Sequence, residues 1–223
     1  MKKIVLLLHS LIKSFLLLII PSLCAYCKIF LPKRTILCDE CDSKIFPIVS
    51  TRIDITAHVC VTVFALSDYK DPLKKLVLAK RWSDPIASYG LAQLLWEKTM
   101  LSTLDYDIIT SIPLHWTRYA SRGFNQAQEM AQVIAHKRKV PVVHLLKRVK
   151  KTAFQFELAA SSRGTNVKNA FELCIVDTQR YKNKHILLVD DLMTTGATIR
   201  EAAKELLKLQ PRKITVVVAC RVI

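Results

Sequence analysis

One segment of twelve residues, 187–198, constrains the fold more than any other part of the chain. It reads Leu-Leu-Val-Asp-Asp-Leu-Met-Thr-Thr-Gly-Ala-Thr: an apolar strand, two acids, a short loop rich in hydroxyls and the start of a helix. A wholly apolar strand is typical of a parallel sheet that is covered by helices on both faces. In such sheets ligands bind beyond the carboxyl ends of the strands. The segment therefore predicts an α/β fold with a ligand site at this loop.

The loop and the helix that follows it are suited to a phosphate group. A helix N-terminus offers N–H groups that have no intrahelical acceptor, together with a partial positive charge. Gly196 lets the backbone approach a ligand closely because it has no Cβ atom. The predicted phosphate site therefore consists of Thr194, Thr195, Gly196, Ala197 and Thr198.

Two acids, Asp190 and Asp191, precede this loop. They would repel a phosphate that they faced, so we expect them to hold sugar hydroxyls or a Mg²⁺ ion, which prefers oxygen ligands. The alternative is a solvated Asp-Asp turn followed by a threonine helix cap. Two ionised carboxylates at the end of an apolar strand are costly without a partner, which favours the ligand-binding interpretation.

From Tyr106 the chain alternates between strand and helix patterns, which indicates a parallel sheet flanked by helices. We expect strands at 58–64, 107–112, 140–146, 185–189 and 214–219, and helices at 71–80, 85–100, 125–137 and 198–209. Residues 42–60 are expected to be a connection with short strands. The chain has only four glycines and contains neither G-x-G-x-x-G nor G-x-x-x-x-G-K-[ST]. The usual dinucleotide-binding turn and the P-loop ATPases are therefore excluded.

Four of the seven cysteines form two C-x-x-C pairs separated by ten residues: Cys24, Cys27, Cys38 and Cys41. Two such pairs supply the four thiolates of a tetrahedral, structural Zn²⁺ site. Two redox pairs or two disulfides are the alternatives. The other three cysteines are expected to be buried core thiols: Cys60, Cys174 and Cys220. A zinc site beside unpaired cysteines indicates a reducing, cytoplasmic location.

Residues 1–23 are apolar and basic, with no acid. They imitate a secretory signal, but Lys13 interrupts the apolar region and no small-residue cleavage site follows. We interpret this segment as an apolar helix that docks on the protein or lies on a membrane surface. The whole chain carries 34 Lys and Arg against 18 Asp and Glu, a net charge of +16, which indicates a polyanionic partner. The densest basic stretch, 136–151, is either a solvated face or a surface for phosphates or nucleic acid.

Segment 187–198 resembles the phosphoribosyl-pyrophosphate (PRPP) loop of type I phosphoribosyltransferases. Together with the cysteine pairs, Ile112-Pro113-Leu114 and the string Arg122-Gly123-Phe124-Asn125-Gln126, it makes the chain similar to the ComF/GntX family over residues 24–220. The resemblance implies the type I phosphoribosyltransferase fold. It also implies that Asp190 and Asp191 are the catalytic pair, contacting the ribose hydroxyls, and that residues 194–198 bind the 5′-phosphate.

The loop after Pro113 is the candidate pyrophosphate site, with Arg118 and Arg122 as charge partners, because arginine suits phosphate oxygens. Arg148 and Arg163 are left open between surface ion pairs and phosphate contacts. Trp116 is the one tryptophan for which a role beyond packing is considered. The expected domains are an N-terminal helix (1–23), a zinc-binding module (24–45), a hood or connecting region (46–100) and a phosphoribosyltransferase-like domain (101–223).

Three functions follow as alternatives. The first is an enzyme that transfers phosphoribose from PRPP, with Mg²⁺, to an unidentified acceptor. The second is a binding protein in natural competence and DNA uptake, which contacts single-stranded DNA and works with a helicase-like ATPase. The third is a sensor that binds PRPP without turnover. A homo-oligomer and a membrane-peripheral location are further expectations.

Overall fold

The computed structural model describes residues 22–33, 35–78, 85–150, 167–174 and 177–222. Residues 1–21 of the expected helix 1–23 and the candidate residue Arg163 lie outside these ranges, and Leu23 forms an isolated antiparallel bridge with Phe30 rather than a helix. The chain divides into two compact units, Met1–Lys44 and Ile45–Ile223. Within the described residues, no helix combines the length and the apolar character that a membrane span requires.

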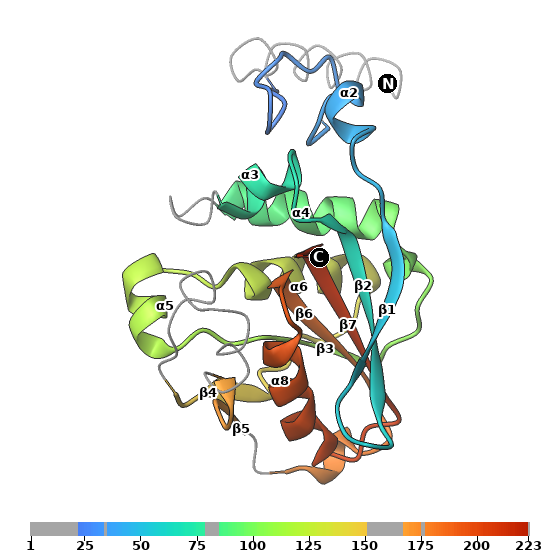
Figure 1. Ribbon diagram of the computed structural model, residues 1–223, viewed down its shortest axis with the longest axis vertical. Coiled ribbons are helices and arrows are strands. Elements are labelled where there is room, and N and C mark those ends of the chain that lie inside the picture. Colours follow the sequence, from blue (N-terminus) through green and yellow to red (C-terminus); the bar gives the residue numbers. More distant parts are fainter. Residues whose placement is uncertain (1–21, 34, 79–84, 151–166, 175–176, 223) are drawn as a thin grey trace, which may run out of the picture. The chain divides into compact units, whose positions relative to one another are not determined.

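The larger unit is built on a five-stranded sheet with the order β1-β2-β7-β6-β3 (Figure 1). Its strands are β1 (Ile48–Asp54), β2 (Cys60–Asp68), β3 (Ile108–Ser111), β6 (His185–Met193) and β7 (Lys213–Arg221). Strands β2, β7, β6 and β3 pair in parallel, whereas β1 pairs with β2 in the antiparallel sense. The predicted α/β class is therefore confirmed, with one antiparallel edge strand added.

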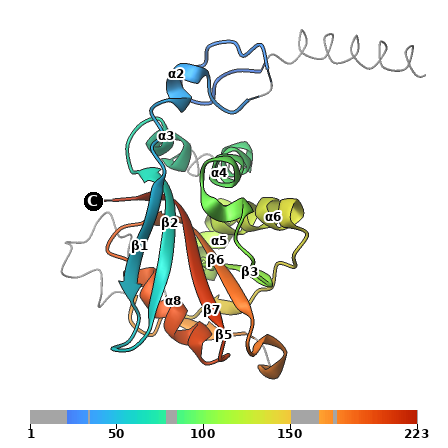
Figure 2. The ribbon, with the colours of Figure 1, turned by 90° about the vertical axis from the view of Figure 1, so that its right-hand side faces the viewer.

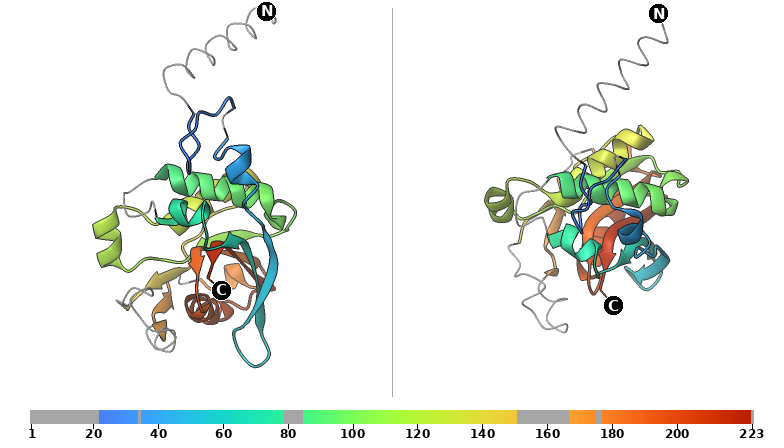
Figure 3. Two further views of the ribbon diagram at one scale, coloured as in Figure 1. Left: turned by 45° about the horizontal axis from the view of Figure 1, so that its top comes forward. Right: turned by 90° about the horizontal axis from the view of Figure 1, so that it is seen from above.

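Helices cover both faces of this sheet (Figure 2). They are α3 (Leu73–Leu78), α4 (Pro85–Lys98), α5 (Trp116–Arg122), α6 (Gln126–Arg138) and α8 (Ala197–Leu207), with short 3₁₀ turns at Met100–Ser102 and Gln179–Tyr181. Helix α4 packs against α6 (Figure 3). Alternate side chains of β6 point to opposite faces: Ile186 and Leu188 belong to the buried cluster with Ala202 and Leu206 of α8. Every residue from His185 to Asp190 is buried, as a strand covered on both sides requires.

The strand expected at residues 140–146 is not formed. The segment makes one isolated parallel bridge, Val142 with Ile109, and the next strand is β4 (Leu146–Arg148). β4 pairs with β5 (Phe171–Leu173) in a separate two-stranded sheet that lies beside α8 (Figure 1). The β-branched segment is thus used as a connection that runs from the large sheet to the small one.

Within residues 46–100, strand β2 lies inside the large sheet, paired with β7, and residues from Ile45 onward belong to a single compact unit. The expectation for the free cysteines needs correction: Cys220 is buried, but Cys60 and Cys174 are exposed. Cys60 begins β2 and Cys174 follows β5, so both lie at strand ends that the core does not cover.

Candidate functional site

The site predicted at residues 190–198 lies where β6 ends and α8 begins (Figure 1). Strand β6 extends to Met193, so both acids belong to the strand rather than to the loop. The N-cap residue of α8 is Gly196, whose φ of 73° lies in the left-handed region. Because glycine has no side chain, the N-cap residue itself cannot cap the first N–H groups of α8. Those N–H groups are the donors that a phosphate would use.

Asp190 is buried, with 8% of its surface exposed, and its Oδ1 accepts a hydrogen bond of 2.8 Å from the backbone N–H of Asp191. A solvated turn at this position, the alternative considered from the sequence, does not fit such burial. Asp190 also lines a small pocket together with Thr194, Gly196, Ala197 and Thr198. We call this the loop pocket. It brings one of the two acids and the helix N-terminus to the same hollow.

The segment after β3 runs beside the end of β6, because the Ile112 N–H donates to the Val189 carbonyl at 2.9 Å. It leads through the N-cap residue His115 into α5, which carries Arg118. The side chain of Arg122, the other predicted pyrophosphate ligand, lies outside the described part of the structure. Helix α5 ends at Gly123, which adopts a φ of 76°.

Asn125 joins this segment to the sheet. Its amide Nδ2 donates to the carbonyl of Ile112 at 2.9 Å, and its Oδ1 accepts from the N–H of Ala127, in the first turn of α6, at 3.2 Å. Asn125 is therefore the N-cap of α6 and a clamp on the end of β3. In the string of residues 122–126, Gly123 thus allows the left-handed backbone that ends α5, and the side chain of Asn125 bonds to two backbone groups.

From the sequence, Arg148 was left open between a surface ion pair and a phosphate contact. The fold places it near the site. It ends β4, and its guanidinium lies over the ring of Phe171, 5.3 Å from the ring centre. The pKa of Arg148 is lowered to about 10, chiefly by burial and further by the charge of Arg118, whereas the charge of Asp190 acts to raise it. Arg118, Arg148 and Asp190 are therefore close enough to interact electrostatically. In the sequence, the one indication of a role for Arg148 was that it belongs to the motifs shared with the ComF/GntX family.

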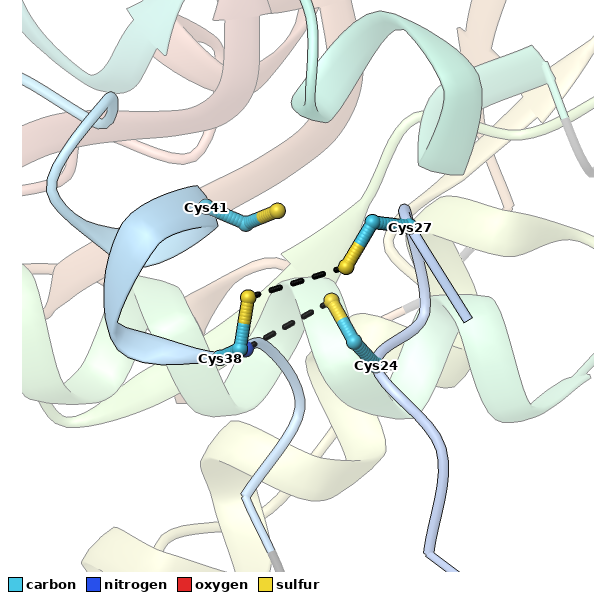
Figure 4. A group of neighbouring side chains, drawn as sticks. All are labelled: Cys24, Cys27, Cys38 and Cys41. Atoms are coloured by element: carbon cyan, nitrogen blue, oxygen red, sulfur yellow. Dashed lines mark hydrogen bonds between the residues drawn. The ribbon is translucent and has the colours of Figure 1, made fainter. Parts of the chain in front are cut away.

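The four cysteine sulfurs of the N-terminal unit converge, as Figure 4 shows, and lie within 4.8 Å of one another. Cys27 Sγ and Cys38 Sγ are 3.7 Å apart. A tetrahedral zinc ion with bonds near 2.3 Å places its ligand sulfurs about 3.8 Å apart. A disulfide needs a separation of about 2.05 Å. The cluster therefore fits a Zn(Cys)₄ site and does not fit two disulfides.

The local backbone explains this convergence. The Lys28 N–H donates to the Cys24 carbonyl at 3.0 Å, and Lys28 adopts a φ of 66°, which closes the first turn tightly. The second pair straddles the start of α2 (Asp39–Asp42), which begins directly after Cys38. Burial alone would raise the pKa of the Cys24 thiol, but hydrogen bonds from the backbone of Cys27, Cys38 and Tyr26 bring the pKa down to about 6. The thiolate, which is the form that binds a metal, is thus favoured at this position.

The parallel sheet and its strand–acid–acid–loop–helix edge define a protein of the phosphoribosyltransferase type, and the model of the phosphoribosyl transferase domain matches residues 108–223. The DNA utilization protein YhgH of Salmonella typhimurium is 29% identical over 215 residues, 90% of each chain. The YhgH protein of Salmonella typhi is 34% identical over 165 residues, 70% of each chain. Competence protein F of Haemophilus influenzae is 38% identical over 111 residues, 49% of this chain and 48% of that one. The chain belongs to the ComF family, as its motifs predicted.

Proposed function

We propose that the chain binds PRPP with Mg²⁺ around the loop pocket, on the surface where β6 ends and α8 begins, and acts in the handling of DNA. The main support for PRPP binding is that buried Asp190 and the N-terminus of α8, whose N-cap residue Gly196 has no side chain, line the same pocket. The second half is supported by the relatives, whose names refer to DNA utilization and to competence.

Each group has a distinct task in this proposal. The N-terminus of α8 holds the 5′-phosphate, and Asp190 and Asp191 hold the ribose hydroxyls. Mg²⁺ is usually bound by one or two carboxylates together with substrate phosphates, which this donor set permits. Arg118 and Arg148 offset the charge of the pyrophosphate, which leaves C1 as positive charge develops on the sugar ring. No acceptor is assigned, so the proposal covers both an enzyme and a PRPP sensor.

Isothermal calorimetry with PRPP tests this proposal. We expect saturable heat in the presence of Mg²⁺ and much weaker binding without it. The double variant Asp190→Asn, Asp191→Asn keeps the size of both side chains and removes their charge, so it is expected to abolish the signal. The matched control is Asp177→Asn, an exposed acid outside the site. No heat with folded, zinc-loaded wild-type protein would refute PRPP binding.

A second candidate function is the binding of single-stranded DNA, for which α5 supplies a specific observation. Its Trp116 is 71% exposed and its Tyr119 is 49% exposed, and because they are three positions apart they share one face of the helix. Exposed aromatic rings beside basic groups are suited to stacking on unpaired bases. The stretch 136–151, by contrast, is partly engaged: Arg138 pairs with Asp105 and Lys147 with Glu172.

The salt dependence of binding separates DNA from a small ligand. For single strands, log affinity falls with log salt by about 0.7 per neutralised phosphate. Trp116→Ala is expected to weaken binding of an oligonucleotide about tenfold without changing this slope, because stacking is not ionic. Equal affinity of Trp116→Ala and wild type would exclude α5. The ATPase partner, the homo-oligomer and the cytoplasmic or membrane-peripheral location stay predictions.

A further inference from the structure

A second pocket lies on the other side of the phosphate loop, against strand β1, and no role has been assigned to it so far. It has a volume of about 390 Å³. We call it the β1 pocket. Thr194 and Gly196 line both pockets, while Thr195 lines only this one.

Three arginines from three separate elements line the β1 pocket: Arg52 of β1, Arg200 of α8 and Arg221 of β7. Among the described residues, Asp54 is the one acid in its lining, and it is exposed. Guanidinium groups bind phosphate oxygens through paired N–H donors. The charge of the lining therefore selects an anion.

Hydrogen bonds fix two of these arginines in place. Arg221 donates through Nε to Asp68 Oδ1 at 3.1 Å and through a terminal nitrogen to Thr51 Oγ1 at 2.8 Å. Arg200 donates through Nε to the Asp54 carbonyl at 2.9 Å, which uses one of its five N–H donors. A side chain that is already held loses little conformational entropy when it binds a ligand. The site is therefore pre-organised by elements that lie far apart in the sequence.

The size and the apolar part of the lining narrow the class of ligand. Pockets of about 300–1,000 Å³ take whole small molecules rather than single ions. Ile53, Met193 and Val222 add apolar surface beside the arginines. A flat, partly apolar ring system attached to more than one phosphate would use both parts of this lining. We propose that the β1 pocket binds a phosphorylated small molecule of the size of a nucleoside diphosphate, separately from the ligand of the loop pocket.

The test is a calorimetric titration of the full chain with ADP, in the absence of PRPP. We expect saturable binding of ADP and none of adenosine, which lacks only the phosphates. Pyrophosphate alone is expected to bind more weakly than ADP, because it leaves the apolar lining unused. Adenosine binding as tightly as ADP, pyrophosphate binding as tightly as ADP, or no binding at millimolar ADP would each overturn the proposal.

Variants assign the binding to this pocket. The side chain of Arg52 is exposed and bonds to none of the described residues, so Arg52→Glu is expected to fold normally and to raise the Kd for ADP at least tenfold. The control is Arg180→Glu, an exposed arginine in the turn before β6, which makes the same change in net charge. It is expected to stay within about twofold of wild type. Equal loss of affinity in both variants would mean that ADP responds only to the overall charge, and the proposal would fail. Arg200→Ala provides a second test, from α8 rather than β1. If its melting temperature shows that it is folded, it should also raise the Kd for ADP, and an unchanged Kd would contradict the proposal.

Discussion

Ile53 of β1 lies directly against Gly196, the N-cap residue of α8: a Cβ atom placed on Gly196 would come within 2.8 Å of Ile53 Cδ1. The two residues are 143 positions apart in the sequence, yet this contact decides which residue can stand in the phosphate loop. Glycine is needed here for two separate reasons, the left-handed backbone and the close neighbour.

Gly196→Ala is therefore expected to lower the free energy of unfolding by about 1–3 kcal/mol, since a left-handed non-glycine residue costs about 1–2 kcal/mol before any steric overlap. Chemical denaturation measures the change. Gly123→Ala is the matched control, because Gly123 also has a left-handed φ, of 76°, but nothing lies within 4 Å of its Cβ position. Gly196→Ala is expected to lose more free energy of unfolding than Gly123→Ala does. Adding Ile53→Val to Gly196→Ala should restore only this additional loss. No recovery would show that Ile53 is not the obstacle.

Asn125→Ala is expected to destabilise the protein by about 1–2 kcal/mol, because it removes the N-cap of α6 and the bond to the Ile112 carbonyl. Asn125→Ser keeps an uncharged acceptor for the Ala127 N–H and loses the bond to the Ile112 carbonyl, so its loss of stability should be smaller. Denaturant midpoints of the two variants make the comparison. If serine is as harmful as alanine, the cap is not what stabilises this junction.

His185 makes stability depend on pH. It is buried in β6, with Nδ1 donating to the Asp105 carbonyl and Nε2 bonded to Thr215 Oγ1, and desolvation by burial lowers its pKa from 6.5. The unfolded chain therefore takes up a proton at a higher pH than the folded one. This contribution to the free energy of unfolding is complete above about pH 6.5 and decreases as the pH falls below that value. Unfolding measured at about pH 7.5 and about pH 5.5 should show a smaller difference in His185→Gln than in wild type. An equal difference would contradict this assignment.

The cysteine cluster predicts one zinc ion per chain, measured by elemental analysis of the purified protein. Cys38→Ser removes one of the four sulfurs and should lose both the metal and the folded N-terminal unit. Cys60→Ser is the control, since Cys60 is exposed and lies outside the cluster. Full zinc occupancy in Cys38→Ser would mean that other ligands hold the metal.

Arg148 tests the assignment of the PRPP site. Because Arg148 is partly buried and interacts with Asp190, Arg148→Ala should raise the Kd for PRPP with Mg²⁺ about tenfold or more, the loss expected for a hydrogen bond to a charged group. Arg148→Lys keeps the positive charge but lacks the planar guanidinium group, so its Kd for PRPP should lie between those of wild type and Arg148→Ala. Lys150→Ala, an exposed lysine two residues on, should bind like wild type in the same titration. An unchanged Kd in Arg148→Ala would place the pyrophosphate elsewhere.

The elements with strong local patterns were predictable. Strand β6, helix α8 and helix α6 appear within a few residues of their expected bounds, because hydrophobic periodicity and capping residues act over one or two turns. The strand prediction for residues 140–146 was wrong because it used only local composition. Their β-branched side chains favour a strand, but no described strand pairs with the whole segment.

By itself the sequence determined the family, the four-cysteine spacing and the order strand, two acids, loop and helix, since each of these is a local arrangement of residue types. Only the tertiary structure decided that β1 and β2 complete the sheet, that Arg148 meets Asp190, and that Arg52, Arg200 and Arg221 line one pocket. Those juxtapositions join residues many positions apart, such as Arg221 and Asp68. They depend on which strands pair and on what each helix covers, and the packing of the whole core settles both.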